Sequence, residues 1–166
     1  MKRRFLSLLL VAVPLLAGAQ VKYGYFSYGE VFRAMSEYSI AERNLAQLQE
    51  QYEAEMKRAE EEFNKKYEEF LEGMQDFAAP IRQKRQAELQ EIMEKNLSFK
   101  QEAQRLLDAA RRDAYLPLKE KLSTAVKTLG AERGYALILN TDNDACPYLD
   151  PATSEDVTPF LKELLK

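Results

Sequence analysis

The side chains that most often carry out catalysis are scarce in this sequence of 166 residues. It contains no histidine, so the commonest general base and metal ligand is missing. Its single cysteine, Cys146, lacks the imidazole partner that would activate a thiol as a nucleophile. Glutamate pairs are frequent, but no motif beside them would bind an electrophile, and solvated helix faces explain them better. We therefore predict that the protein is not an enzyme and uses no cofactor.

A segment next to Cys146 begins like a calcium-binding loop. Residues 140–144 read Asn-Thr-Asp-Asn-Asp, but Ala145 stands where such a loop has glycine, and no glutamate occupies the twelfth position. We expect a hairpin turn here and no metal site. Cys146 itself is either buried or paired between two chains, since an odd cysteine cannot form an internal disulfide. The short apolar stretch 145–149 favours burial.

The first 19 residues have the pattern of a secretory signal peptide. Three basic residues at positions 2–4 precede an apolar run, 5–16, and Ala-Gly-Ala at 17–19 matches the small residues of a cleavage site. Gln20 follows where a lipid-anchored protein would carry cysteine. No later apolar run approaches the roughly 20 residues that a membrane span needs. We expect cleavage after Ala19 and export of the mature chain.

The charge of the chain argues against one class of partner. The full sequence has a net charge of −3, and loss of the signal peptide with its three basic residues leaves −6. A chain this acidic is not expected to bind nucleic acid. Segment 37–72 carries eleven acidic and five basic residues, whereas 76–127 carries eight acidic and eleven basic ones. Opposite charges on two helical segments favour their antiparallel pairing.

One long apolar stripe dominates the middle of the sequence. Its members recur at intervals of three and four residues, close to the period of an α-helix: Leu45, Leu48, Tyr52, Met56, Ala59, Phe63, Tyr67, Phe70 and Met74. With a capping box that begins at Ser39, the spacing predicts a nearly straight helix over 40–72, about 50 Å long. Gly73 and Pro80 bracket a turn, after which a second helix returns to about Leu129.

The flanking segments predict a small sheet and two short helices. Strands are expected at 21–26, 135–139 and 146–149. Ser27 begins another capping box, which opens a short helix, and Thr158 is the expected N-cap of a closing helix. Pro117 lies inside the returning helix and predicts a kink or a break where the hairpin joins these segments.

The fold class that we expect is α+β and mainly α, with a long antiparallel helical hairpin projecting from a small β-containing body. The body would combine 20–38 with 117–166, and the hairpin would span 39–116 with its tip at about 73–80. A core of about 55 residues is marginal and a three-stranded sheet leaves open edges, so we expect protomers to share one body. The side chains expected at this shared body are Tyr23, Tyr25, Phe26, Leu137, Ile138, Leu139 and Tyr148.

The order of these features resembles the Skp/OmpH family of periplasmic chaperones. The matching features are the signal peptide, the capped short helix, the long charged hairpin and four short motifs: Tyr25-Phe26-Ser27, Pro117-Leu118 followed by Lys121, Gly134-Tyr135 and Asp156-Val157-Thr158. The resemblance implies a homotrimer whose helical arms enclose a cavity. It also implies that the cavity holds unfolded outer-membrane proteins in the periplasm without ATP or covalent chemistry. The acidic mature chain departs from the best-known members, which are strongly basic.

Six side chains towards the tip are the candidates for contact with such clients: Phe63, Tyr67, Phe70, Met74, Phe77 and Ile81. Aromatic and thioether groups adapt to varied apolar partners. The alternative is that these residues pack the two helices of the hairpin together, as an apolar stripe at helical spacing usually does. Only the side chains that point away from the hairpin seam can contact a client.

A basic cluster beside the turn, Arg82, Lys84 and Arg85, suggests a second kind of contact. It would bind phosphate or lipid head groups weakly at a membrane surface, or else its three charges are simply solvated. A different overall interpretation also stays open, in which the hairpin is a structural spacer or adaptor that docks one folded partner of the cell envelope. A compact patch at the tip would favour the adaptor, and apolar residues spread over several turns favour the chaperone.

Overall fold

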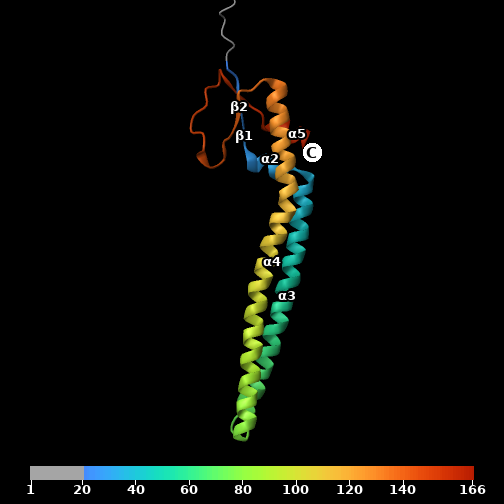
Figure 1. Cartoon of the computed structure of the whole chain (residues 1–166), viewed down its shortest axis with the longest axis vertical. Coiled ribbons are helices and arrows are strands. Elements are labelled where there is room, and N and C mark those ends of the chain that lie inside the picture. The colour runs from blue at the N-terminus through green and yellow to red at the C-terminus, as the bar shows by residue number, and fades with distance from the viewer. Residues whose placement is uncertain (1–20) are drawn as a thin grey trace, which may run out of the picture. The chain divides into compact units, whose positions relative to one another are not determined.

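The computed structural model describes residues 21–166 (Figure 1). The predicted signal peptide, 1–19, lies outside the described residues. The described chain divides into two compact units, which we call the hairpin unit, Ser36–Glu120, and the sheet unit, 21–35 together with Lys121–Lys166. None of the helices in 21–166 is both long enough and apolar enough to cross a membrane.

A small parallel sheet organises the sheet unit. Its strands are β1 (Tyr23–Phe26), β2 (Leu137–Asn140) and β3 (Ser154–Asp156). The order is β2-β1-β3, and both outer strands run parallel to β1. Tyr25 pairs with Leu139 on one side and with Asp156 on the other. The first two predicted strands are confirmed, and each begins two residues later than expected.

The third predicted strand, at 146–149, is wrong. The third strand, β3, lies further along the chain and pairs with β1. No hairpin therefore joins β2 to β3. The segment 140–144, where a hairpin turn was expected, contains a short 3₁₀-helix, η2 (Asp142–Asp144). Pro147 removes a backbone donor from the predicted segment, whereas β3 consists of polar residues without an apolar strand signal. Cys146 in this loop is half-exposed, so its predicted burial is wrong as well.

Two short helices complete the sheet unit, α2 (Tyr28–Ala34) and α5 (Thr158–Leu164). The Ser27 hydroxyl accepts a hydrogen bond from the backbone N–H of Glu30 at 3.2 Å, which confirms the predicted cap of α2. The cap of α5 is Val157, one residue before the predicted Thr158. The hydroxyl of Thr158 instead accepts a hydrogen bond from the backbone N–H of Ser27 at 3.2 Å, and thereby links the starts of the two helices.

The core of the sheet unit is aliphatic. Its most deeply buried side chains are Val31, Met35, Leu122, Val157 and Leu161. Complete burial of such a side chain adds about 1.5–3 kcal/mol to the free energy of unfolding. This core therefore stabilises the sheet unit although its sheet is small. Among the residues predicted for a shared body, Phe26 is 4% exposed, whereas Leu137 and Tyr148 are 43% and 78% exposed.

Two long antiparallel helices form the hairpin unit, where α3 lies beside the first part of α4 (Figure 1). Their bounds are α3 (Ser36–Gly73) and α4 (Ala79–Arg133). The prediction of the two helices is confirmed, but α3 begins four residues before the expected start at Ile40. Ser39 lies inside α3, where its hydroxyl donates a hydrogen bond to the carbonyl of Ser36 at 2.8 Å. The predicted capping box at Ser39 is therefore wrong.

Of the kink or break predicted at Pro117, the break is wrong, because α4 continues through this residue to Arg133. Pro117 cannot donate the intrahelical bond to Asp113, at a cost of about 3 kcal/mol. The neighbouring Leu118 is 6% exposed and Leu122 is 0% exposed, and burial of these two side chains offsets that cost. The helix ends before Gly134, which has a positive φ of 68° and serves as the expected C-terminal glycine.

The turn between the two long helices is tight. The backbone N–H groups of Asp76 and Phe77 both donate to the carbonyl of Gly73, at 3.0 and 3.1 Å. A Cβ at Gly73 would come within 2.3 Å of the Phe77 ring, so any other residue here would force this ring to move. Pro80 is the second residue of α4, one position later than predicted.

Candidate functional site

The apolar stripe of α3 forms the seam of the hairpin unit. Leu45 and Phe70 are each 8% exposed, and most stripe residues between them are half-buried. Tyr52 packs edge-on against Phe99 of α4, with ring centroids 6.2 Å apart. Packing between the helices therefore accounts for most of the stripe, while Tyr67, at 45% exposure, lies largely in solvent.

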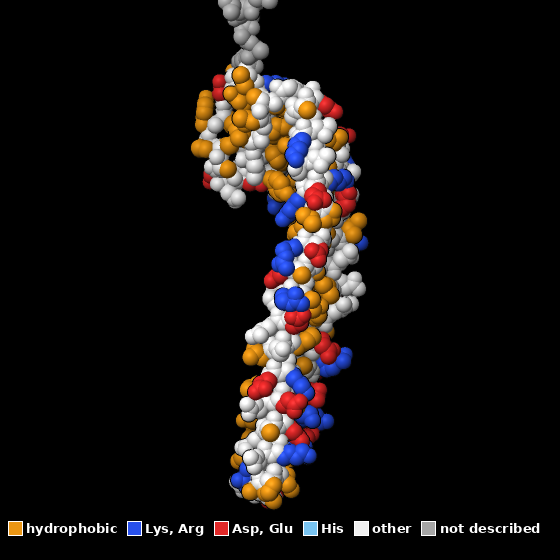
Figure 2. All heavy atoms as spheres, in the orientation of Figure 1, with side chains coloured by type: hydrophobic (Ala, Val, Ile, Leu, Met, Phe, Trp, Pro, Cys, Tyr) orange, Lys and Arg blue, Asp and Glu red, His pale blue; other side chains and the backbone are white. Residues whose placement is uncertain are grey.

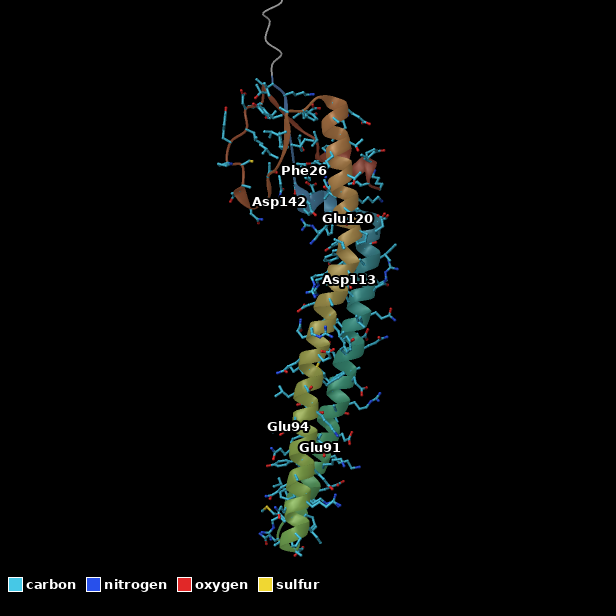
Figure 3. All side chains as sticks on the ribbon, in the orientation of Figure 1. Phe26, Glu91, Glu94, Asp113, Glu120 and Asp142 are labelled. Atoms are coloured by element: carbon cyan, nitrogen blue, oxygen red, sulfur yellow. The ribbon has the colours of Figure 1, made fainter. Side chains whose placement is uncertain are left out.

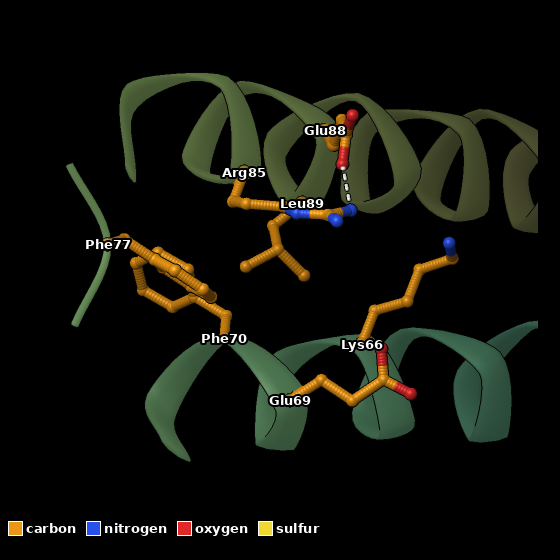
Figure 4. Close-up of a pocket in the computed structure, with 7 residues that line it drawn as sticks. All are labelled: Lys66, Glu69, Phe70, Phe77, Arg85, Glu88 and Leu89. Carbon is orange, nitrogen blue, oxygen red and sulfur yellow. Dashed lines mark hydrogen bonds and ion pairs between the residues drawn. The ribbon is translucent and has the colours of Figure 1, made fainter. Parts of the chain in front are cut away.

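The six candidate contact residues separate into two groups. Phe70 is buried and packs against Phe77 with ring centroids 6.4 Å apart (Figure 4). Phe63, half-buried, stacks on Tyr67 at 6.0 Å. The remaining candidates are open to solvent, with exposed fractions of 45% for Tyr67, 37% for Met74 and 50% for Ile81.

A small pocket of about 80 Å³ lies beside the Phe70–Phe77 pair. Leu89 adds to its apolar wall, and Arg85 is held by Glu88 at 3.0 Å on its rim (Figure 4). Lys66 and Glu69 complete the lining: Lys66, Glu69, Phe70, Phe77, Arg85, Glu88 and Leu89. This volume corresponds to a few water molecules, so the pocket is too small to enclose a large side chain.

The predicted basic cluster is partly neutralised by its own helix. Lys84 and Arg85 both approach Glu88, with closest distances of 3.8 and 3.0 Å. Arg82 donates a hydrogen bond to the carbonyl of Phe77 at 3.3 Å. All three side chains remain on the surface, but a phosphate group would have to compete with these internal partners.

Sequence reasoning missed several exposed apolar side chains of the hairpin unit. Leu71, Met93 and Leu97 are 47%, 55% and 58% exposed. Figure 2 shows hydrophobic side chains on the surface between charged ones along the hairpin. The signal that would identify them is helical phase, because Leu97 directly follows the seam residue Asn96 and therefore lies on the flank of α4.

Two hydrogen-bonded carboxylates link separate segments of the sheet unit. Asp142, on the loop after β2, accepts hydrogen bonds from the Ser27 hydroxyl and the Gly29 backbone N–H, both at 2.7 Å (Figure 3). These donors hold the pKa of Asp142 below its usual range. Glu155 on β3 contacts Lys22 and the Tyr135 hydroxyl, each at 2.5 Å, and its pKa is lowered by both.

One phenol in the hairpin unit is also perturbed. Tyr115 donates a hydrogen bond to Glu42 and stacks on Tyr38, with ring centroids 5.9 Å apart. Burial raises the pKa of Tyr115, and the neighbouring Glu42 carboxylate raises it further. This cluster ties the start of α3 to α4. Across residues 21–166, no group of three carboxylate or thiol ligands is arranged to hold a metal ion.

Comparison with known proteins places the chain in a family. It matches the OmpH-like outer membrane protein family over residues 22–165. A search of curated proteins finds no match. Among solved structures, an OmpH-like outer membrane chaperone from Caulobacter crescentus CB15 is similar with a TM-score of 0.75 and 16% identity, covering 90% of this chain and 86% of that one. At this identity the likeness shows a common fold, and the match along nearly the whole described chain shows that the protein belongs to the OmpH-like family.

Proposed function

We propose that the protein is an ATP-independent holdase chaperone of the periplasm, which binds unfolded outer-membrane proteins and prevents their aggregation. Membership of the OmpH-like family supports a chaperone role. The observation that carries the proposal is that the hairpin unit leaves many apolar side chains in solvent, among them Tyr67, Leu71, Met74, Ile81, Met93 and Leu97. They lie on both helices and in the turn between them, as expected of a surface that accepts varied segments.

The chemistry of the client fits weak, distributed contacts. An unfolded β-barrel protein exposes alternating apolar residues and unpaired strand edges, both of which promote aggregation in water. Tyr67 and Met74 can cover such segments without selecting one sequence, because a broad ring and a flexible thioether adapt to differently shaped neighbours. Many weak contacts also allow release without ATP, since each can be broken separately.

The proposed assembly is a homotrimer whose helical hairpins surround the client. In the described part of the chain, β2 and β3 are the outer strands of the sheet, so each has one edge that no other strand pairs with. Leu137 on β2 and Tyr148 in the following loop are exposed apolar groups that a shared body would cover. Ile138 and Leu139 of β2, with Tyr23 and Tyr25 of β1, are half-buried in the single chain and complete the candidate surface.

Light scattering coupled to gel filtration tests both parts of this proposal. The mature chain alone is expected to have the mass of three copies. After addition of an outer-membrane β-barrel protein diluted from denaturant, a complex of one client with three copies is expected without nucleotide. A stable monomer would refute the trimer. A trimer that leaves the client aggregated but binds one folded envelope protein tightly would favour the adaptor.

Weak contact with a membrane surface through Arg82, Lys84 and Arg85 is a further part of the proposal. Reversal of all three charges to glutamate is expected to reduce sedimentation with vesicles that contain anionic lipid. The effect should disappear at high ionic strength, where exposed charges are screened. Unchanged sedimentation at low ionic strength would rule out this contact.

A further inference from the structure

Two hollows along the hairpin unit share three lining residues and thus form one groove. The shared residues are Met56 of α3 with Leu97 and Lys100 of α4. Asn96 and Phe99 line the first hollow, and Ala103, Gln104 and Leu107 line the second. We call this surface the mid-hairpin groove and define it by Met56, Leu97, Lys100, Ala103 and Leu107.

The floor of the groove is apolar and its wall is open to solvent. Ala103 is 2% exposed, so its small side chain leaves space above the seam. Leu97 is 58% exposed although it borders this space. Met93 lies one helical turn before Leu97 and is 55% exposed. Covering an apolar surface that has this much solvent contact with an apolar partner is favourable, because it removes the surface from water.

The groove lies on one flank of α4. Leu106 is nine residues after Leu97, which at 3.6 residues per turn places the two side chains on opposite sides of the helix. The groove is lined by Leu97 and not by Leu106, so it lies on the flank of Leu97. The pocket near the turn is a separate space, which shares no lining residue with the groove.

The rim of the groove favours an uncharged occupant. Glu53 and Glu60 of α3 contribute two negative charges, while Lys57 and Lys100 contribute two positive ones. Their balance gives no net attraction for an acidic or a basic ligand at this position. Met56 and Leu97 provide a flexible thioether and a branched aliphatic surface, which suit aliphatic or aromatic side chains of varied shape.

The length of the groove matches that of a short extended chain. From Asn96 to Leu107, α4 rises about 16 Å at 1.5 Å per residue. An extended chain of about five residues has the same length at roughly 3.3 Å per residue. Because alternate side chains of an extended chain point the same way, about three of the five would enter the groove together.

We propose that the mid-hairpin groove binds a short extended segment of a non-native polypeptide in which uncharged apolar residues alternate with polar ones. This is the pattern of a strand from a membrane β-barrel before it folds. The inference rests on the proposed holdase function and assigns its principal contact to the middle of the hairpin. The aromatic residues Phe70 and Phe77 at the turn act structurally, because they pack against each other.

Fluorescence anisotropy with a synthetic peptide tests the groove. The probe is a labelled peptide of about ten residues in which leucine alternates with threonine, and a second peptide of the same composition spaces its leucines at helical intervals. The mature protein should bind the alternating peptide more tightly. Leu97→Gln should weaken this binding about tenfold, and Leu106→Gln should change it less than twofold. Both side chains are solvent-accessible, at 58% and 36% exposure, so neither substitution should prevent folding.

Two results of the peptide assay would overturn the inference. One is equal binding by the Leu97 and Leu106 variants, and the other is equal binding of the two peptides by the unmodified protein. Suppression of client aggregation separates this failure from failure of the proposed function. If the unmodified protein suppresses aggregation and Leu97→Gln does so equally well, the groove assignment fails and the holdase stands. If the unmodified protein does not suppress aggregation, the holdase itself fails.

Discussion

Asn96 on α4 donates a hydrogen bond from its side-chain amide to the backbone carbonyl of Ala59 on α3, 3.1 Å away. This contact places a polar group in the seam of the hairpin unit. A polar side chain between paired helices fixes their register at some cost in stability, because other alignments leave it without a partner. The small side chain of Ala59 allows this close approach of α4.

Replacement of Asn96 by leucine should therefore stabilise the hairpin and loosen its alignment. Additional apolar burial should add about 1 kcal/mol to the free energy of unfolding. Thermal melts followed by circular dichroism measure the first effect, and distances between spin labels on α3 and α4 measure the second. Gln83→Leu, at an exposed position of α4, is the control and should change neither. A narrower distance distribution in Asn96→Leu would contradict a register role.

The turn should depend on the absence of a side chain at residue 73. Gly73→Ala forces its methyl group against the Phe77 ring and should destabilise the turn by about 1–3 kcal/mol. Hydrogen exchange of the amides in 73–79 should accelerate accordingly. If the ring causes this loss, Gly73→Ala should cost much less stability when it is introduced into Phe77→Ala, which has no ring. An equal loss in the unmodified protein and in Phe77→Ala would show that the ring is not the cause.

Phe70 and Tyr67 should respond differently to truncation although they are one turn apart on α3. Phe70 is 8% exposed, so Phe70→Ser should destabilise the hairpin unit by about 3 kcal/mol. Tyr67 is 45% exposed, so Tyr67→Ser should leave stability within about 0.5 kcal/mol and weaken client holding. Chemical denaturation and client aggregation measure the two effects. Equal stability of the variants would contradict the assignment of Phe70 to the seam.

The hydrogen bonds of Asp142 should make the sheet unit sensitive to acid. The folded-state pKa of Asp142 is lowered by its bonds to Ser27 and Gly29, whereas the unfolded value is about 3.9. The Asp142 carboxylate therefore makes its full contribution to stability above about pH 4. This contribution is lost as the pH falls through the lower pKa that Asp142 has in the folded state. Asp142→Asn should cost about 1 kcal/mol at pH 7, and its difference from the unmodified protein should shrink below pH 4.

Urea titrations over a range of pH measure this dependence. Asp144→Asn, at an exposed neighbouring position, is the matched control and should change the free energy of unfolding at pH 7 by less than about 0.5 kcal/mol. A difference between Asp142→Asn and the unmodified protein that stays constant from pH 7 to about pH 3 would show that ionisation of Asp142 does not stabilise the fold.

The long helices could be predicted because their signal is repeated over many turns. The stripe from Leu45 to Met74 predicted α3, and Gly73 with Pro80 predicted the turn. The start of α3 at Ser36 could not be predicted from Ser39, since a serine three residues before glutamate is equally compatible with a helix interior. A kink or a break was expected at Pro117, and the break does not occur because burial of nearby leucines is a tertiary effect that a local rule does not include.

The third strand of the sheet and the exposed contact residues could not be predicted from local sequence alone. β3 is polar, and it is a strand because Tyr25 pairs with Asp156 from a distant part of the chain. Phe70 and Tyr67 are both aromatic members of the stripe, but they differ in exposure. The difference arises from packing against α4, which covers one of the two side chains more than the other. Leu97 could be recognised only once Asn96 was known to face α3.

Aggregation of a client is the most direct test of the central claim, that this OmpH-like protein holds unfolded outer-membrane proteins. An outer-membrane β-barrel protein is diluted from denaturant into buffer without lipid or nucleotide, and its light scattering is followed as the mature protein is added. We predict that scattering falls to its minimum near one trimer per client. Scattering that stays unchanged at a severalfold excess of trimer would contradict the account.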